Sequence, residues 1–204
     1  MILVGRYLSP FVRRVAVTLR LYGLEYEHRP LMAFGDDKKT ISQWNPVGRV
    51  PVLILDDGES LFESGAILDY LDERVGPDRS LTPASGRPRR EVLRLLALAT
   101  GAAEKTVLTL YEVRFRPEEK RHEPWVAMCS DQVRRGFEAL DAAAAMPWMT
   151  GETMGQADVI AACCWSFAKH AKPELTETIR APRLDAIAAR AESMPEFQQT
   201  VPNP

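Results

Sequence analysis

The chain has 204 residues, of which 46% are hydrophobic and 26% are charged. These proportions are typical of a folded globular protein and exclude a disordered or collagen-like chain. The formal net charge of −2 gives no basic excess of the kind that neutralises phosphates, so we expect no nucleic acid partner.

The first elements are a short strand and an amphipathic helix. Residues 2–4 form an apolar run that ends at Gly5. From Pro10 onward, apolar residues recur at intervals of three and four, which predicts a helix over about residues 10–22. Ser9 is a favourable N-cap, Pro10 suits the first helical position, and Gly23 supplies the left-handed residue that commonly ends a helix.

The rest of the first half predicts a small mixed domain. A second strand is expected around residues 25–29, and one irregular helix within residues 33–45. Residues 52–55 read as a buried strand, and a turn signal then predicts an antiparallel return over residues 60–62. A helix follows over residues 64–75. The predicted order is therefore βαβ, then α, then ββα.

Residues 76–88 contain three prolines and two glycines without hydrophobic periodicity, which indicates a domain boundary. We therefore predict a first domain over residues 1–76, a linker over 77–87 and an all-helical domain over 88–204. Long stretches at helical spacing cover residues 92–115 and 124–145, and the segment after Gly155 is helical too. The fold class is thus α/β followed by all-α.

The most informative motif places Pro51 at the first residue of an apparently central strand. Proline removes a hydrogen-bond donor from a sheet, so this position is unusual. A cis bond between Val50 and Pro51 resolves the conflict because it turns the chain and leaves the Val50 amide and carbonyl free. A free edge of this kind can pair with an extended peptide.

A second motif begins the helix over residues 64–75. Ser64 is predicted to cap this helix, whose first amide groups are unpaired and can bind a carboxylate. Glu63, beside it, brings a negative charge that can pair with an ammonium group. The two positions together suit an amino-acid head group, and the γ-glutamyl end of glutathione is such a group.

With these motifs the chain resembles the soluble glutathione S-transferase family, in its bacterial type with an N-terminal Ser-Pro motif. The resemblance implies a thioredoxin-like N-terminal domain, a helical-bundle C-terminal domain and a homodimer. It also implies that glutathione, as cosubstrate, is bound by the Val50 backbone and by Glu63 and Ser64, and that the Arg49 side chain contacts the peptide.

The resemblance places Ser9 opposite the glutathione sulfur as the catalytic residue. A free thiol has a pKa of about 8.5, and lowering it by about two units requires roughly 2.7 kcal/mol, which a hydroxyl donor and a helix N-terminus can supply together. Two alternatives stay open: Ser9 is only a cap, or Tyr7 supplies the donor as the phenol does in tyrosine-type members. Ser9 cannot form a mixed disulfide, so glutaredoxin-like chemistry is not expected.

Other residues point to structural roles. Asp158 occupies the family's capping-box position with glycine at the N-cap, Gly155, and should be structural. Short basic pairs, among them Arg13-Arg14, are predicted on solvated helix faces. Cysteine and histidine spacings support no metal site and no disulfide framework, which fits a reducing compartment. With no signal peptide or membrane span in sequence, we expect a cytoplasmic protein without membrane partners.

The predicted function is transfer of the glutathione thiolate to a small hydrophobic electrophile, as in detoxification. One alternative is a binding or interaction protein with the transferase fold and no activity. Another is a glutathione-dependent isomerase similar to the maleylacetoacetate enzymes, although their motif has more serines and a cysteine where this chain has residues 7–13. The acceptor, the pathway and the dimer interface stay open.

Overall fold

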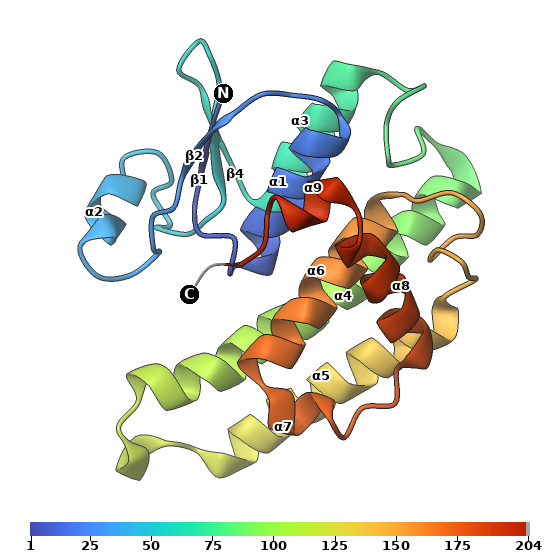
Figure 1. Cartoon of the computed structure of the whole chain (residues 1–204). Coiled ribbons are helices and arrows are strands. Elements are labelled where there is room, and N and C mark those ends of the chain that lie inside the picture. Colours follow the sequence, from blue (N-terminus) through green and yellow to red (C-terminus); the bar gives the residue numbers. More distant parts are fainter. Residues whose placement is uncertain (203–204) are drawn as a thin grey trace. The chain divides into compact units, whose positions relative to one another are not determined.

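A computed structural model describes residues 1–202. These residues divide into two compact units (Figure 1). The first unit contains residues 1–84 together with residues 192–202, and the second contains residues 85–191. The first unit therefore takes in both ends of the described chain, which the predicted boundaries did not anticipate.

The first unit is built on a four-stranded sheet. Its strands lie in the order β2-β1-β3-β4, with β1 parallel to β2 and antiparallel to β3, and β3 antiparallel to β4. This arrangement confirms the predicted mixed α/β fold, and all seven predicted elements occur in the predicted order. Their bounds are β1 (Ile2–Val4), α1 (Pro10–Leu21), β2 (Glu27–Arg29), α2 (Asp37–Ile41), β3 (Val52–Ile54), β4 (Ser60–Phe62) and α3 (Ser64–Val75).

Helices cover both faces of the sheet. α1 and α3 pack against each other on one face, and α2 lies on the other (Figure 1). The larger cluster of apolar side chains joins α1 and α3 to Leu3 and Leu53 of the sheet, all of them buried. A smaller cluster joins Val4 and Val52 to Ile41 of α2. Alternate residues of β1 and β3 thus point to opposite faces, as the twofold period of a strand requires.

The start of α3 differs from the prediction by one residue. Glu63, rather than Ser64, is the N-cap, and Ser64 is the first helical residue. Glu63 has a φ of 71°, a conformation that residues with side chains seldom adopt. Its carboxylate accepts a hydrogen bond from the Gly65 amide, so the capping acceptor is Glu63 itself.

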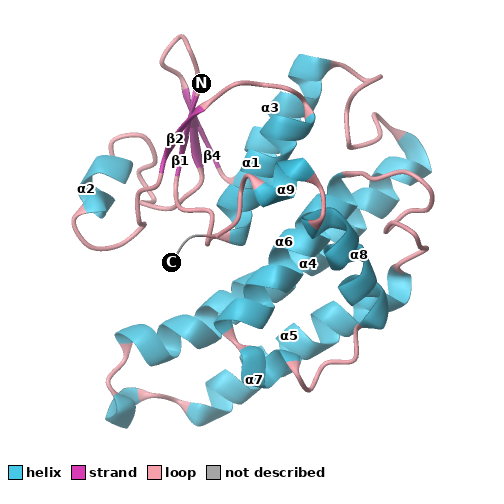
Figure 2. Ribbon diagram, viewed as in Figure 1, coloured by secondary structure: helices cyan, strands magenta, loops and turns pink. Residues whose placement is uncertain are grey.

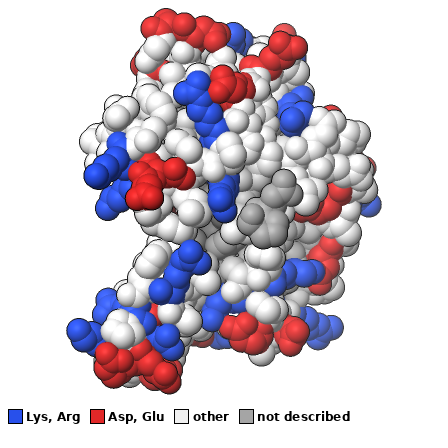
Figure 3. All heavy atoms as spheres, turned by 60° about the vertical axis from the view of Figure 1, so that its left-hand side comes forward, with Lys and Arg blue, Asp and Glu red and all other residues white. Residues whose placement is uncertain are grey.

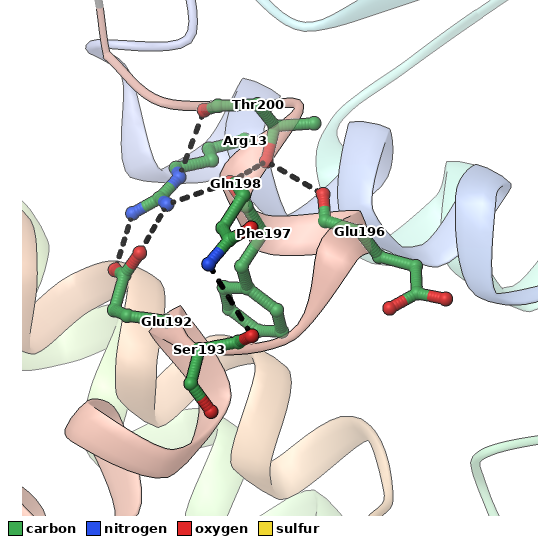
Figure 4. Close-up of polar contacts among 7 residues, drawn as sticks. All are labelled: Arg13, Glu192, Ser193, Glu196, Phe197, Gln198 and Thr200. Carbon is green, nitrogen blue, oxygen red and sulfur yellow. Dashed lines mark hydrogen bonds and ion pairs between the residues drawn. The ribbon is translucent and has the colours of Figure 1, made fainter.

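Arg13 and Arg14 are not on a solvated face, which corrects a second prediction: each is only 2% exposed. The Arg13 guanidinium binds the end of the chain, where Glu192 and the carbonyls of Phe197 and Thr200 accept its hydrogen bonds (Figure 4). Residues 192–202 therefore belong to the first unit and not to a helical domain over residues 88–204.

The second unit is helical (Figure 2). Its longest helix, α4, begins at Gly86, inside the predicted linker, and packs against α5 and α6. In residues 85–191 the structure has no strand beyond an isolated bridge between Trp148 and Gly151. The helical elements are α4 (Gly86–Phe115), the 3-10 turn η1 (Glu118–Lys120), α5 (Glu123–Ala143), α6 (Gln156–Ala171), α7 (Pro173–Thr176) and α8 (Pro182–Glu192); α9 (Pro195–Gln198) lies in the first unit.

α6 begins as its sequence predicts. Asp158 is fully buried and accepts hydrogen bonds from the amides of Met149, at 2.6 Å, and Gly155, at 2.9 Å. It closes the start of α6 without a side chain at Gly155, which supports its structural role. No helix within residues 1–202 is both long enough and apolar enough to cross a membrane.

Candidate functional site

The loop before β3 is held by Asn45. Its side-chain carbonyl accepts from the Val47 amide at 3.0 Å, and its side-chain amide donates to the Arg49 carbonyl at 2.8 Å. The bond between Val50 and Pro51 is cis, as predicted. Within residues 1–202 no protein group hydrogen-bonds the backbone amide or carbonyl of Val50. These two groups are therefore available to an extended peptide, and the exposed Arg49 stands next to them.

Gly5, at the end of β1, allows the first turn of α1 and the loop carrying Val50 to come close to β1. A Cβ atom built on Gly5 would lie 2.6 Å from Val12 Cγ2 and 2.9 Å from Val50 Cβ, closer than real side chains approach. Its φ of 126° also favours glycine. The first turn of α1 and the loop carrying Val50 thus meet where only glycine fits.

The β3–β4 hairpin places the start of α3 beside the same loop. Val52 pairs with Phe62, so Val50 and Ser64 both lie two residues beyond this pair, at the same end of the hairpin. The guanidinium of the buried Arg14 reaches this end too, because its Nη2 is 3.7 Å from a Cβ atom built on Gly65. The register thus brings Val50 near the pair Glu63 and Ser64.

The Glu63 carboxylate lies over the first turn of α3. One oxygen accepts from the Gly65 amide at 2.9 Å and the other from the Ser64 hydroxyl at 3.2 Å. Ser64 is 1% exposed, whereas Glu63 is exposed. The Glu63 carboxylate therefore accepts from the same donors that the sequence predicts for a ligand carboxylate.

Ser9 is the N-cap of α1, as predicted. Its hydroxyl oxygen is 3.5 Å from the Val12 amide, at the outer limit of a hydrogen bond. The side chain is half-buried and its carbonyl accepts the first hydrogen bond of the helix, from Arg13. The hydroxyl only accepts in this contact, so its proton stays available to another acceptor at the start of α1.

The phenol of Tyr7 is engaged elsewhere. Its oxygen is 2.9 Å from the phenolic oxygen of Tyr26, and its ring stacks on His28 with centroids 3.9 Å apart. Burial, and then the hydrogen bond with Tyr26, raise the pKa of Tyr7 well above the usual range of a tyrosine. The phenol is therefore neutral and hydrogen-bonded to Tyr26 inside the first unit.

Sequence reasoning missed three residues that shape this region: Gly5, Asn45 and Gly65. The role of Asn45 is predictable, since an asparagine side chain in a turn commonly hydrogen-bonds the backbone two residues further on. The sequence pattern indicates only a strand end at Gly5 and only a helical residue at Gly65. Their role depends on close approach between segments, which has no local signal.

A separate cavity of 660 Å³ lies elsewhere in the first unit and is lined by Arg20, Tyr26 and Glu196 among others. None of the predicted site residues lines it. Acidic and basic side chains are interspersed on the face drawn in Figure 3. Among residues 1–202 no cluster of three or more histidine, cysteine or acidic side chains could hold a metal ion.

Comparisons with known proteins identify the family. Residues 3–79 match the family described as glutathione S-transferase, N-terminal domain. An uncharacterized GST-like protein of Escherichia coli K12 is 26% identical over 98% of each chain. A probable maleylacetoacetate isomerase of Vibrio cholerae is 30% identical over 99% of this chain and 95% of its own length.

Among solved structures, a glutathione S-transferase of Methylobacterium radiotolerans in complex with glutathione sulfonate superposes with a TM-score of 0.92. It is 28% identical in sequence, and the match covers 100% of this chain and 95% of the other. The likeness extends over both units and includes the region that carries Ser9, Val50 and Glu63.

Proposed function

Because the chain belongs to the glutathione S-transferase family, we propose that it binds glutathione on its first unit and activates the thiol for attack on a small electrophile. The observation that carries the proposal is the convergence of three segments: the start of α1, the loop ending in Val50 and the start of α3. The comparisons support glutathione binding, and the transfer step is our inference.

In this proposal the peptide of glutathione extends along Val50. The cysteine amide and carbonyl of glutathione pair with the Val50 carbonyl and amide, which have no other partner within residues 1–202. The γ-glutamyl carboxylate takes the donors of Ser64 and Gly65, and Glu63 turns to the ammonium group. The exposed side chain of Arg49 contacts the peptide from the loop.

Ser9 then donates its hydroxyl hydrogen to the sulfur. The proton leaves the thiol for solvent, the thiolate is stabilised by the hydroxyl and the N-terminus of α1, and the serine itself is never the nucleophile. The sulfur forms a bond to the electrophilic carbon while the leaving group departs, or while the electron pair of a conjugated double bond shifts and is protonated. The occupied phenol of Tyr7 favours Ser9 as the donor.

A second candidate is glutathione-dependent isomerisation, which the near-full-length likeness to a probable maleylacetoacetate isomerase favours. There the thiolate would add to a conjugated double bond, the single bond so formed would rotate, and elimination would return the thiolate. Residues 7–13 lack the additional serines and the cysteine of that group. Transfer therefore stays the first candidate, and a binding protein without activity the third.

The proposal also includes a cytoplasmic location and a homodimer, and sedimentation measures the oligomeric state directly. The first functional test is a calorimetric titration with glutathione, repeated with S-methylglutathione. We expect a dissociation constant between micromolar and low millimolar, about 4 to 8 kcal/mol. Absence of binding would favour the interaction protein.

Assays of glutathione consumption then separate the two enzymes. A transferase consumes one glutathione for each electrophile converted, whereas an isomerase converts its substrate without loss of glutathione. Isomerisation of a conjugated cis-diacid at constant glutathione concentration would make glutathione-dependent isomerisation the first candidate.

A further inference from the structure

The guanidinium of Arg13 makes four hydrogen bonds to the end of the chain, drawn in Figure 4. Two join it to the Glu192 carboxylate, at 2.7 and 2.6 Å, and two go to the carbonyls of Thr200, at 3.0 Å, and Phe197, at 3.3 Å. The guanidinium also lies 5.7 Å from the centre of the Phe197 ring. We call residues 192–200 the C-terminal segment.

This contact is buried and charged. The Arg13 side chain is 3% exposed and that of Glu192 is 32% exposed, while Phe197 and Thr200 are fully buried. A two-pronged contact between a guanidinium and a carboxylate fixes orientation as well as distance. Arg13 is therefore held at a fixed place and angle by residues 179 to 187 positions later in the chain.

Arg13 also lies in the first turn of α1, next to Ser9. Its amide donates to the Ser9 carbonyl at 2.9 Å, the first hydrogen bond of α1. The Ser9 hydroxyl, by contrast, has only the 3.5 Å contact with the Val12 amide. The backbone bond to Ser9 places Arg13 in the first turn of α1, so the clamped Arg13 side chain fixes the turn that begins at Ser9.

We infer that Arg13, clamped by the C-terminal segment, is a positioning residue that sets the Ser9 hydroxyl against the glutathione sulfur. The inference rests on the proposed function, since it assigns Ser9 the role of thiol donor. Arg13 itself touches neither the peptide nor the sulfur in this scheme. Hydrogen bonding to a thiolate depends steeply on distance and angle, so a small displacement of the Ser9 hydroxyl stabilises the thiolate less.

Arg20 provides a matched control. It lies near the other end of α1, and its guanidinium donates to the Gln199 side chain of the same C-terminal segment. Arg13→Met and Arg20→Met therefore both remove a contact between α1 and the C-terminal segment, but only Arg13 lies in the turn of α1 that begins at Ser9. Glu192→Gln is a milder change, because it keeps one acceptor for the guanidinium.

The experiment measures the pKa of the thiol of bound glutathione, from thiolate absorbance against pH, in the full-length wild type and the three variants. Binding of S-methylglutathione is measured in parallel. We expect Arg13→Met and Glu192→Gln to raise the pKa of the bound thiol by about one unit toward the 8.5 of a free thiol. Affinity for S-methylglutathione should change less than about twofold, and Arg20→Met should leave the thiol pKa unchanged.

An unchanged thiol pKa in Glu192→Gln overturns the inference. This test remains decisive if Arg13→Met does not fold. An equal increase in Arg20→Met also overturns it, because general loosening of α1 would then explain the effect. A wild type that binds glutathione without lowering its thiol pKa removes thiol activation and this inference together. If the wild type lowers the thiol pKa and no variant changes it, the inference about Arg13 is wrong while thiol activation stands.

Discussion

The phenolic oxygens of Tyr7 and Tyr26 lie 2.9 Å apart, so the hydroxyl that could rival Ser9 already has a partner. The Tyr7 ring is fixed as well, because it stacks on His28 with an angle of 2° between the planes. His28 is in turn held, since its Nε2 is 2.8 Å from the Gly5 carbonyl. Turning Tyr7 toward a ligand would break both of its contacts.

This relationship predicts opposite results for two substitutions. Ser9→Ala should lower kcat/KM at neutral pH by about tenfold to a hundredfold, because a hydrogen bond to a charged group contributes about 1.5–3 kcal/mol. Glutathione affinity should stay within about threefold, since the peptide contacts are made by other residues. Tyr7→Phe should retain most activity.

Steady-state kinetics with a chromogenic electrophile check both variants. Equal activity in Ser9→Ala and wild type, together with loss in Tyr7→Phe, would assign the donor to Tyr7. Because removal of the Tyr7 hydroxyl leaves Tyr26 without that partner, a thermal unfolding curve for Tyr7→Phe is the necessary control.

Local signals account for most of the predicted fold. The strand over residues 2–4, the helix starting at Pro10 and the hairpin over residues 52–62 were readable because periodicity, caps and turn residues lie within a few positions of one another. The cis bond before Pro51 was predictable too, from a proline at the start of a central strand. These are the elements that place the candidate site.

Long-range contacts account for what the sequence did not predict. The Arg13-Arg14 pair has the local pattern of a solvated face, and its partners lie near the other end of the chain, so nothing nearby indicates burial. The N-cap of α3 was misplaced because a glutamate at a positive φ is rare, and its carboxylate replaces the serine as the acceptor. The close approach at Gly5 is likewise a property of three separate segments.

The start of α6 predicts a stabilising substitution. Gly155 is the N-cap with φ of −142° and ψ of −170°, a conformation open to serine. Gly155→Ser should raise the free energy of unfolding by a few tenths of a kcal/mol, about 1 °C in melting temperature. Calorimetry of the full-length protein measures this, and a lower melting temperature would show that the added side chain clashes.

Asp158 predicts a stability that depends on pH. Burial raises the pKa of this carboxyl above 3.8, against the lowering effect of the amides of Met149 and Gly155. The folded state therefore keeps the proton to higher pH than the unfolded state does. The stability contributed by this titration is fully present below the unfolded pKa and is lost as pH rises through the folded pKa.

Asp158→Asn removes that titration and one acceptor, so it should destabilise the protein by about 1–3 kcal/mol. The difference from wild type should be larger near pH 4 than at pH 7, because only the wild type gains from protonation. Denaturant unfolding at the two pH values tests this. A difference that grows with pH would mean that the ionised carboxylate is the favoured form in the fold.

Gly65→Ala should separate binding from folding. A Cβ atom at position 65 would lie 2.8 Å from Glu63 Oε2, so the methyl group would displace a flexible carboxylate rather than the backbone. The helix itself favours alanine over glycine by up to about 1 kcal/mol. We therefore expect a stable protein in which the added methyl group obstructs carboxylate binding to Ser64 and the Gly65 amide. Glutathione affinity should fall by about tenfold or more.

The matched control is Gly101→Ala, in α4 of the second unit. A Cβ atom there meets nothing within 4 Å, so the same helix preference applies without any change at the candidate site. Calorimetric titration of both variants with S-methylglutathione should give a wild-type dissociation constant for Gly101→Ala alone. Wild-type affinity in Gly65→Ala would place the γ-glutamyl carboxylate elsewhere, because a carboxylate oxygen where Glu63 Oε2 now lies would be 2.8 Å from the added Cβ.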